Sequence, residues 1–280
     1  MKRFLAILLI FGLAINYSCS AATTFIVGGK YAENGQFPYM VSLGNVNFPG
    51  SHGCGGGILN QRWILSAAHC FIQTPPNVVI ARVGNVERMK GVTYKIIKIV
   101  QHPRFIRNIP PVYVSNWHDI AVIKTDVPIV YNEFVQPIAI GHRHIIGNIQ
   151  ATVAGFGAFD PSIDLNFPLE DLVMADRLKY IETQIITFND CSRRANIFNT
   201  INPFYLNLFV HPTSHICTLQ PRGIGVCFGD SGSMLIANGV VVGVTASGIR
   251  LCAQAHAAPD IFARVSTYAV WVENEIQDLN

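Results

Sequence analysis

The sequence contains little charge and few long apolar stretches. Of its 280 residues, 13% are charged, and the formal net charge is +3. It has no basic run interleaved with aromatic residues, so we expect no nucleic-acid partner. It also has no basic amphipathic helix pattern, so binding to a membrane surface is not expected. Internal repeats are absent as well, which excludes a solenoid.

The one long apolar run lies at the N-terminus. Two basic residues precede a hydrophobic stretch over residues 4–15, and small residues follow it as far as Ala22. A basic start, a short apolar core and small residues at its end form a secretory signal peptide. The apolar core is too short to span a bilayer comfortably, which disfavours a retained membrane anchor. We therefore expect a signal peptide over residues 1–21, cleaved after Ala21 or Ala22, and a secreted, extracellular protein.

Seven cysteines occur in the sequence, and Cys19 lies in the expected signal peptide. The other six are Cys54, Cys70, Cys191, Cys217, Cys227 and Cys252. An even number in an exported chain indicates disulfide bonds, because the extracellular space is oxidising. The spacing of the cysteines does not choose among the many pairings. After the signal peptide there is no Asn-x-Ser/Thr site, so N-glycosylation is not expected.

Short apolar or alternating runs recur along the chain, separated by Gly, Pro and Asn. Examples are residues 78–83, 94–100, 120–123, 152–154, 234–236 and 240–244. They have the length of strands and are rich in Val and Ile, which favours a pleated, half-buried surface. No long helical period is expected before residue 260. The pattern therefore predicts an all-β sandwich or barrel.

The C-terminal segment has a helical period instead. Ser266 or Thr267 can cap the N-terminus of this helix. Its apolar face would consist of Tyr268, Trp271, Val272 and Ile276. The strand pattern of the first half ends near Gln136, which we interpret as a domain boundary. Residues 159–171 form a polar insertion with four acidic residues, for which a solvated loop is favoured over a calcium site.

Three motifs of catalytic type occur in order: SAAHC at 66–70, HDIAV at 118–122 and GDSGS at 229–233. A serine hydroxyl is a weak nucleophile near neutral pH and needs a base to take its proton. The base in turn needs a carboxylate that fixes its tautomer and stabilises the imidazolium. A fourth motif, IVGG, stands at 26–29. The combination predicts nucleophilic catalysis by a serine.

With these motifs the sequence resembles the chymotrypsin–trypsin family of serine proteases, from Ile26 to the C-terminal helix. The resemblance implies two antiparallel six-stranded β-barrels, over residues 26–137 and 138–280, with a helix at the C-terminus. It also implies disulfide bonds Cys54–Cys70, Cys191–Cys217 and Cys227–Cys252. All six cysteines of the exported chain would then be used.

The catalytic roles are carried over from the family, whose triad is well known. His69 is expected to act as general base and then as acid, Asp119 to orient it, and Ser231 to form the acyl-enzyme. The backbone N–H groups of Gly229 and Ser231 would form the oxyanion hole. The alternative is a protease-like protein that binds partners without cutting. Such relatives typically lose a triad residue, and all three are present here.

The resemblance also implies activation by proteolysis. In this family the free amine of the first residue, here Ile26, pairs with the carboxylate of Asp230, so the chain should be a zymogen. Residues 22–25 would form a short activation peptide. This peptide ends in Phe25, where many relatives have Arg or Lys. We therefore predict activation by a chymotrypsin-like enzyme, or by the protein itself, rather than by trypsin.

The primary specificity pocket is assigned by alignment to the family. The expected substrate-binding residues are Gly225, Val226, Phe228, Ala246, Ser247, Gly248 and Asp260. A trypsin-like enzyme would carry Asp at position 225, so strict cleavage after Lys or Arg is disfavoured. The combination of Gly225 with Asp260 resembles the pocket of elastase and of the collagenolytic proteases of arthropods. If Asp260 is turned away and hydrogen-bonded, the pocket takes apolar residues; if it points inward, it could also accept a basic one. The apolar wall made by Val226 favours the first arrangement.

The sequence departs from the family on the strand that pairs with the substrate. Ala246 removes a hydroxyl that normally donates to the triad aspartate, and Ser247 removes an aromatic wall, so we expect weaker activity or a blurred subsite preference. Asn85 replaces the first ligand of calcium-binding relatives, and His142 and His144 are expected to be solvated. We therefore expect neither a metal nor a cofactor.

Together these features predict a secreted serine endopeptidase that cuts after medium to large apolar residues. Its partners would be protein and peptide substrates and protein protease inhibitors, and we expect a monomer. A trypsin-like cascade activator is disfavoured by Gly225. Digestion, a venom or salivary role and immune proteolysis all fit the sequence.

Overall fold

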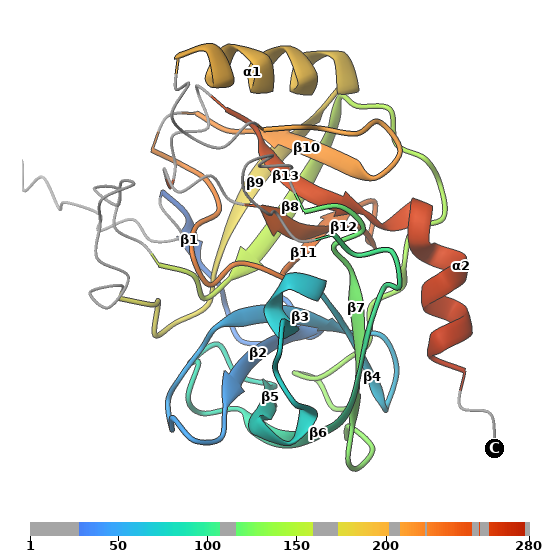
Figure 1. The fold of residues 1–280 in the computed structure, drawn as a ribbon. Helices are drawn as coiled ribbons and strands as arrows, with labels where there is room; N and C mark the ends of the chain where they lie inside the picture. Colours follow the sequence, from blue (N-terminus) through green and yellow to red (C-terminus); the bar gives the residue numbers. More distant parts are fainter. Residues whose placement is uncertain are drawn as a thin grey trace, which may run out of the picture.

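The computed structural model describes residues 28–106, 116–158, 173–201, 208–221, 223–247, 252 and 258–277. In this part of the chain the strands form two antiparallel β-barrels, which lie one above the other in Figure 1. One helix lies at the outer end of the second barrel, and another lies at the side of the molecule. This is the two-barrel architecture that the family resemblance implied. Among the residues described, no helix has the length and hydrophobicity needed to span a membrane.

The first barrel is closed by six strands in the order β2-β3-β4-β7-β6-β5. They are β2 (Met40–Asn45), β3 (Cys54–Ile58), β4 (Trp63–Ser66), β5 (Val79–Val83), β6 (Val92–Gln101) and β7 (Ala121–Thr125). Along β6, buried residues alternate with exposed ones: Tyr94 and Ile96 are buried, and Thr93 and Lys95 are exposed. This alternation is the local signal that allowed the strands to be predicted.

The second barrel has the strand order β9-β10-β13-β12-β11-β8, and the pairing of β8 with β9 closes it. Its strands are β8 (Ile149–Gly155), β9 (Lys179–Ile186), β10 (His215–Leu219), β11 (Met234–Ala237), β12 (Val240–Ser247) and β13 (Asp260–Arg264). A two-residue strand, β1 (Lys30–Tyr31), pairs with β9. The described chain therefore contributes a strand to the second barrel before it forms the first.

Helix α1 (Phe188–Ile201) contradicts the prediction that no long helical period precedes residue 260. Its fully buried side chains are Cys191, Ala195 and Phe198. They are four and three residues apart, which places them on one face of the helix. The backbone N–H of Asp190 donates to the hydroxyl of Thr187 at 3.2 Å, a typical contact at the start of a helix. The prediction was wrong because this apolar stripe is narrow and most of the other residues of the helix are polar.

Helix α2 (Val265–Glu275) confirms the predicted C-terminal helix but not its predicted cap. The helix begins directly after Arg264, and no side chain makes a capping hydrogen bond. The predicted caps, Ser266 and Thr267, lie inside the first turn instead. The hydroxyl of Thr267 donates to a backbone carbonyl in the loop before β10. The helix begins one residue before Ser266, at Val265, whose side chain is buried in the apolar core.

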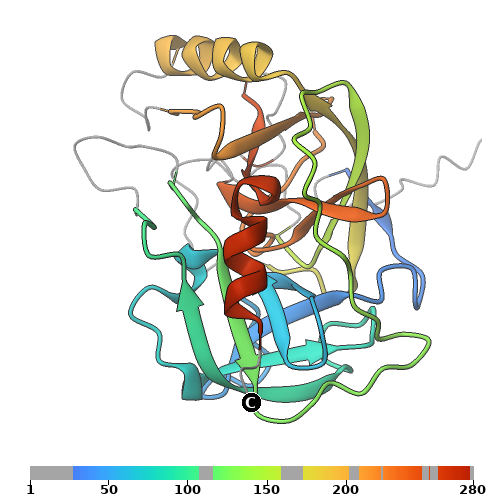
Figure 2. The same ribbon diagram turned by 90° about the vertical axis from the view of Figure 1, so that its right-hand side faces the viewer.

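Helix α2 joins the two barrels by packing. Its Tyr268 and Val272 are buried in one apolar cluster with Trp63 and Leu65 of β4 and Val244 of β12. Figure 2 shows the helix running down from the second barrel past the strands of the first. The helix therefore covers part of both barrels.

The three disulfide bonds implied by the family resemblance are all present. They are Cys54–Cys70, Cys191–Cys217 and Cys227–Cys252, with Cα separations of 6.3, 6.1 and 4.9 Å. The first ties β3 to the turn after β4, and the second ties α1 to β10. The third joins the loop before β11 to residue 252. The first bond therefore fixes the turn that carries His69, which is part of the site described next.

Candidate active site

His69 and Asp119 are joined at one end of the first barrel. His69 lies in a short 3-10 turn (Ala68–Phe71) after β4, and Asp119 precedes β7, the neighbour of β4. Nδ1 of His69 lies 2.6 Å from Oδ2 of Asp119. The backbone N–H of His69 donates to Oδ1 of the same carboxylate at 2.8 Å. The carboxylate thus holds both the side chain and the backbone of His69.

The burial of Asp119 sets the tautomer of the imidazole. The Asp119 side chain is fully buried, whereas the His69 side chain is 22% exposed. An ionised carboxylate only accepts hydrogen bonds, so Nδ1 of the neutral imidazole carries the hydrogen. Nε2 then keeps its lone pair, and it lies 4.0 Å from Sγ of Cys70. The imidazole can therefore act as a base at Nε2.

Ser231 lies in the loop before β11, and this loop packs against the first barrel. The backbone N–H of Gly55 on β3 donates to the carbonyl of Ser231 at 2.7 Å. Gly232 has a φ of +80°, and a Cβ there would lie 2.3 Å from Oγ of Ser66. Only glycine permits this approach. Because Ser66 ends the strand that leads to His69, the loop brings Ser231 to the side of the first barrel where His69 lies.

A buried histidine that the sequence did not single out holds the expected oxyanion loop. Nε2 of His52 lies 2.9 Å from the carbonyl of Gly229, and its Nδ1 lies 2.8 Å from Oγ of Ser42. Desolvation by burial lowers the pKa of His52 to about 4, so the ring is neutral at neutral pH. The neutral ring donates from Nε2 to Gly229 and accepts the Ser42 hydroxyl at Nδ1.

The carboxylate of Asp230 is fully buried beneath the same loop. It accepts hydrogen bonds from the backbone N–H groups of Cys227 and Gly157, both at 2.9 Å. Desolvation raises the pKa of Asp230 to about 7, although these two hydrogen bonds act in the opposite direction. The predicted activation residues Phe25 and Ile26 lie outside the described residues. The structure thus describes one half of the expected activation pair.

The trypsin family model matches residues 26–272 of the chain. The chain belongs to the trypsin family. It is 26% identical to "Serine protease SP24D" of Anopheles gambiae, over 90% of this chain and 81% of that protein. It is 28% identical to "Putative trypsin-6" of Homo sapiens, over 90% and 89%. It is 30% identical to "Chymotrypsin-2" of Vespa crabro, over 89% and 98%. The protein is therefore a serine peptidase of the trypsin family, and its substrates are proteins.

In this trypsin-family chain, the expected pocket residues that the structure describes are mostly buried. Gly225 and Val226 are buried, and Asp260 begins β13 with little exposed surface. The carboxylate of Asp260 accepts a hydrogen bond from the backbone of Val226. Its Oδ2 has no hydrogen-bond partner within the described part of the chain. Desolvation raises the pKa of Asp260 to about 7, so the group titrates near neutrality.

Of the remaining predicted pocket residues, Phe228 lies in the loop before β11, and Ala246 and Ser247 lie on β12. Phe228 is partly buried, and its carbonyl accepts the N–H of Ala158 at 2.7 Å. Ala246 is buried on β12, which ends at Ser247. Gly248 lies outside the described residues.

Asn116 is a second residue of the site that sequence reasoning missed. Its Nδ2 donates to Oδ2 of Asp119 and to the carbonyl of Ala246, both at 3.2 Å. An Asn three residues before the expected triad aspartate carries no recognisable sequence signal, because its contact with β12 forms only in the folded protein. For His52, the only local signal is its place two residues before Cys54.

The trypsin-family chain also brings together a group of side chains of the types that can bind a metal ion. Sulfur and nitrogen atoms of Cys54, His69 and Cys70 form one such group, but the two cysteines are joined in a disulfide bond and offer no thiolate. His142, expected to be solvated, is about half-exposed and contacts the carboxylate of Glu273 at 2.9 Å. That contact is an ordinary surface ion pair when His142 is protonated.

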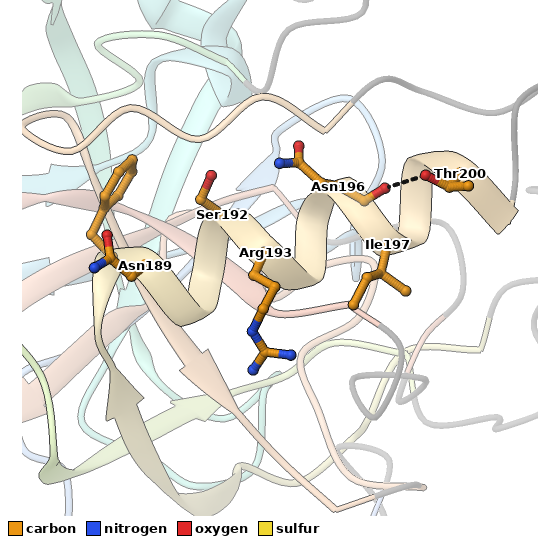
Figure 3. A pocket seen from close by; sticks show the side chains of 7 residues that line it. Asn189, Ser192, Arg193, Asn196, Ile197 and Thr200 are labelled. Carbon is orange, nitrogen blue, oxygen red and sulfur yellow. Dashed lines mark hydrogen bonds between the residues drawn. The ribbon is translucent and has the colours of Figure 1, made fainter.

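The outer face of α1 carries a depression that is separate from this site (Figure 3). Its labelled lining residues are Asn189, Ser192, Arg193, Asn196, Ile197 and Thr200. The hydroxyl of Thr200 donates to the carbonyl of Asn196 at 2.9 Å within the helix. Since α1 lies at the end of the second barrel that faces away from the first (Figure 1), this depression is not part of the site around His69.

Proposed function

We propose that this chain is a secreted serine endopeptidase that forms an acyl-enzyme at Ser231. The observation that carries the proposal is the 2.6 Å contact between Nδ1 of His69 and Oδ2 of Asp119, beside a serine-bearing loop that packs on the same barrel. A buried carboxylate in this position keeps the imidazole in the tautomer that can accept a proton at Nε2. Membership of the trypsin family supports the same roles.

In the first half of the reaction, His69 takes the proton of the Ser231 hydroxyl as Oγ attacks the carbonyl carbon of the peptide bond. The tetrahedral intermediate collapses when His69 gives this proton to the leaving amine, and the acyl group stays on Ser231. Water then attacks the acyl-enzyme, and His69 accepts one of its protons. His69 returns this proton to Oγ as the ester bond breaks. Asp119 stabilises the imidazolium in both halves.

Gly229 and Ser231 would donate their backbone N–H groups to the developing oxyanion. Losing such a donor typically lowers the rate about 100- to 1000-fold. The hydrogen bond from His52 to the carbonyl of Gly229 supports this role, because it fixes the peptide that follows the first donor. A preorganised loop needs no rearrangement when charge develops on the substrate.

We further propose that the protein is made as a zymogen, with a signal peptide over 1–21 and an activation peptide over 22–25. The peptidase domain would span 26–280, divided into barrels over 26–137 and 138–280. Asp230 supports this reading, because a fully buried carboxylate is stabilised by a cationic partner such as the new amine of Ile26.

The primary specificity is proposed to be for medium to large apolar residues. The pocket base lacks a side chain at Gly225, and the buried Val226 adds an apolar wall. The carboxylate of Asp260 accepts a hydrogen bond from the backbone and is partly protonated near neutral pH, so it attracts a basic guest weakly. The likeness to "Chymotrypsin-2" agrees with this choice. We expect a monomer that protein protease inhibitors can block.

The proposed function is tested with the processed protein and a Ser231→Ala control. An irreversible serine-directed inhibitor should label the wild type at Ser231 and abolish its activity, while the control is neither labelled nor active. A peptide library should be cut mainly after Val, Leu, Met or Phe. Absence of labelling in a folded, processed protein would instead indicate a protease-like binding protein. Cleavage dominated by Arg and Lys would contradict the specificity alone.

A further inference from the structure

Asn116 lies three residues before Asp119 and reaches across to the second barrel. Its Nδ2 donates to Oδ2 of Asp119 at 3.2 Å and to the carbonyl of Ala246 on β12 at 3.2 Å. An amide NH2 group carries two hydrogens, so it can make both bonds at once. We propose that Asn116 is a positioning residue that fixes the Asp119 carboxylate behind His69. This inference rests on the proposed function.

The carboxylate of Asp119 needs a donor that does not belong to His69. Within the described part of the chain, its hydrogen bonds come from two residues: His69 supplies two, and Asn116 supplies the third. The backbone N–H of His69 holds Oδ1, but without Asn116 the other oxygen, Oδ2, would contact only the imidazole. Asn116 adds a donor that does not move with the imidazole and that is also bonded to β12, so it fixes Oδ2 relative to the second barrel. The imidazole is then fixed as well, with its Nε2 held in one direction.

The residue at position 246 explains why Asp119 lacks a donor that the family resemblance leads one to expect. The family resemblance leads one to expect a serine there, whose hydroxyl would donate to the triad aspartate, but the chain has a buried Ala246. The amide of Asn116 spans the same two points, the carboxylate of Asp119 and the backbone at residue 246. Asn116 therefore supplies the donor that Ala246 lacks, and it does so from the segment before β7 instead of from β12.

The backbone of Asn116 is itself held from the second barrel. Nε2 of His215, on β10, lies 3.2 Å from the carbonyl of Asn116. The backbone N–H of His211 donates to Nδ1 of His215 at 3.0 Å, so Nε2 carries the hydrogen and donates. His215 is almost completely buried, and desolvation lowers its pKa to about 4, which keeps the ring neutral at working pH. A series of hydrogen bonds thus runs from β10 through Asn116 to Asp119.

The test measures kcat and KM separately on an apolar peptide substrate, with the full chain expressed as a precursor and then processed. Asn116→Ala should lower kcat about tenfold, because one hydrogen bond to a charged group is lost, and should leave KM within about twofold. Adding Ala246→Ser to Asn116→Ala returns a donor to Asp119 from the other side. This double variant should recover most of the lost kcat.

A matched control separates positioning from loss of stability. Asn199 also bridges two segments through its amide, since it bonds both the N–H and the carbonyl of Leu208 at 2.8 and 3.1 Å. Asn199→Ala removes a similar bridge on α1, far from the triad. It should change the unfolding midpoint without changing kcat per folded molecule. If Asn116→Ala does not fold, Asn116→Leu removes the same donors while keeping the size of the side chain.

An unchanged kcat in a folded Asn116→Ala or Asn116→Leu variant would overturn the inference. So would a loss of kcat that Ala246→Ser fails to restore, because the missing group would then not be a donor to Asp119. These outcomes are distinct from failure of the proposed function. In that case the wild type itself would show neither turnover nor labelling by the serine-directed inhibitor.

Discussion

The imidazole of His52 connects the two barrels by a 2.9 Å hydrogen bond to the carbonyl of Gly229. His52 lies just before β3 of the first barrel, and Gly229 lies in the second-barrel loop that carries Ser231. Because the ring also contacts Ser42 on β2, it cannot turn without losing two bonds. The position of the loop that carries Ser231 therefore depends on the first barrel as well as on the second.

His52→Phe keeps a ring in this place but removes both polar atoms. We expect kcat to fall about ten- to a hundredfold, because the loop with the proposed oxyanion donors is no longer fixed. The unfolding free energy should fall by about 1–3 kcal/mol, since buried polar groups lose their partner. Steady-state kinetics and urea unfolding measure both effects. His52→Gln, which keeps a donor, should retain more of the activity, and equal activity of Phe and Gln variants would contradict the assigned role.

The buried histidines predict how stability depends on pH. Burial lowers the pKa of His52 and of His215 to about 4 in the folded protein, below the unfolded value of about 6.5. The unfolded chain therefore binds protons first as the pH falls. These two histidines contribute stability above pH 6.5 that is lost between pH 6.5 and 4, whereas Asp230 and Asp260, whose pKa is raised to about 7, change the stability in the opposite direction over this range. His52 alone should account for about 2 kcal/mol at pH 5. Urea unfolding at pH 7.5 and pH 5 should show that the unfolding free energy falls less for His52→Gln than for the wild type. An identical fall in both proteins would argue against a neutral His52.

Asp260 predicts a specificity that changes with pH. Its pKa is raised to about 7, so the carboxylate is largely protonated at pH 6 and ionised at pH 8.5. The ratio of cleavage after Arg to cleavage after Leu should therefore rise several-fold over this range, although Leu stays preferred. Asp260→Asn, which cannot ionise, should keep the low-pH ratio throughout. A ratio that is constant in the wild type would show that Asp260 does not face the substrate.

Activation should depend on the residue before Ile26. The Ser231→Ala precursor, which cannot process itself, should be cut after Phe25 by the active enzyme or by a chymotrypsin-like protease, and not by trypsin. Phe25→Arg should reverse this preference. N-terminal sequencing of the products identifies the cut. Selective processing of the unaltered precursor by trypsin would show that Phe25 is not the activation point.

The barrel strands could be predicted because their signal is local. Alternation of buried and exposed residues is visible along β6, and the apolar run over 240–244 became part of β12. Helix α1 was missed because its buried stripe consists of few and partly small residues. The predicted caps of α2 were wrong because burial of Val265 decided where the helix begins.

The site could be predicted only as far as its motifs extend. The residues His69 and Asp119 stand in recognisable motifs, and the structure brings them into contact. His52 and Asn116 stand in none, since their roles arise from hydrogen bonds between segments far apart in the sequence. The pairing of the cysteines came from the family resemblance, because spacing alone allowed many pairings.

The two halves of the peptidase exchange their terminal segments. Strand β1 precedes the first barrel in the sequence but pairs with β9 of the second. Helix α2 follows the second barrel but packs on Trp63 and Leu65 of the first. Neither half is therefore a complete folding unit, and the first cannot reach its final packing on a ribosome until the last helix has been synthesised. Expressed separately, each half would expose the apolar surface that the other half normally covers, and we expect the two fragments to be soluble only when they are produced together.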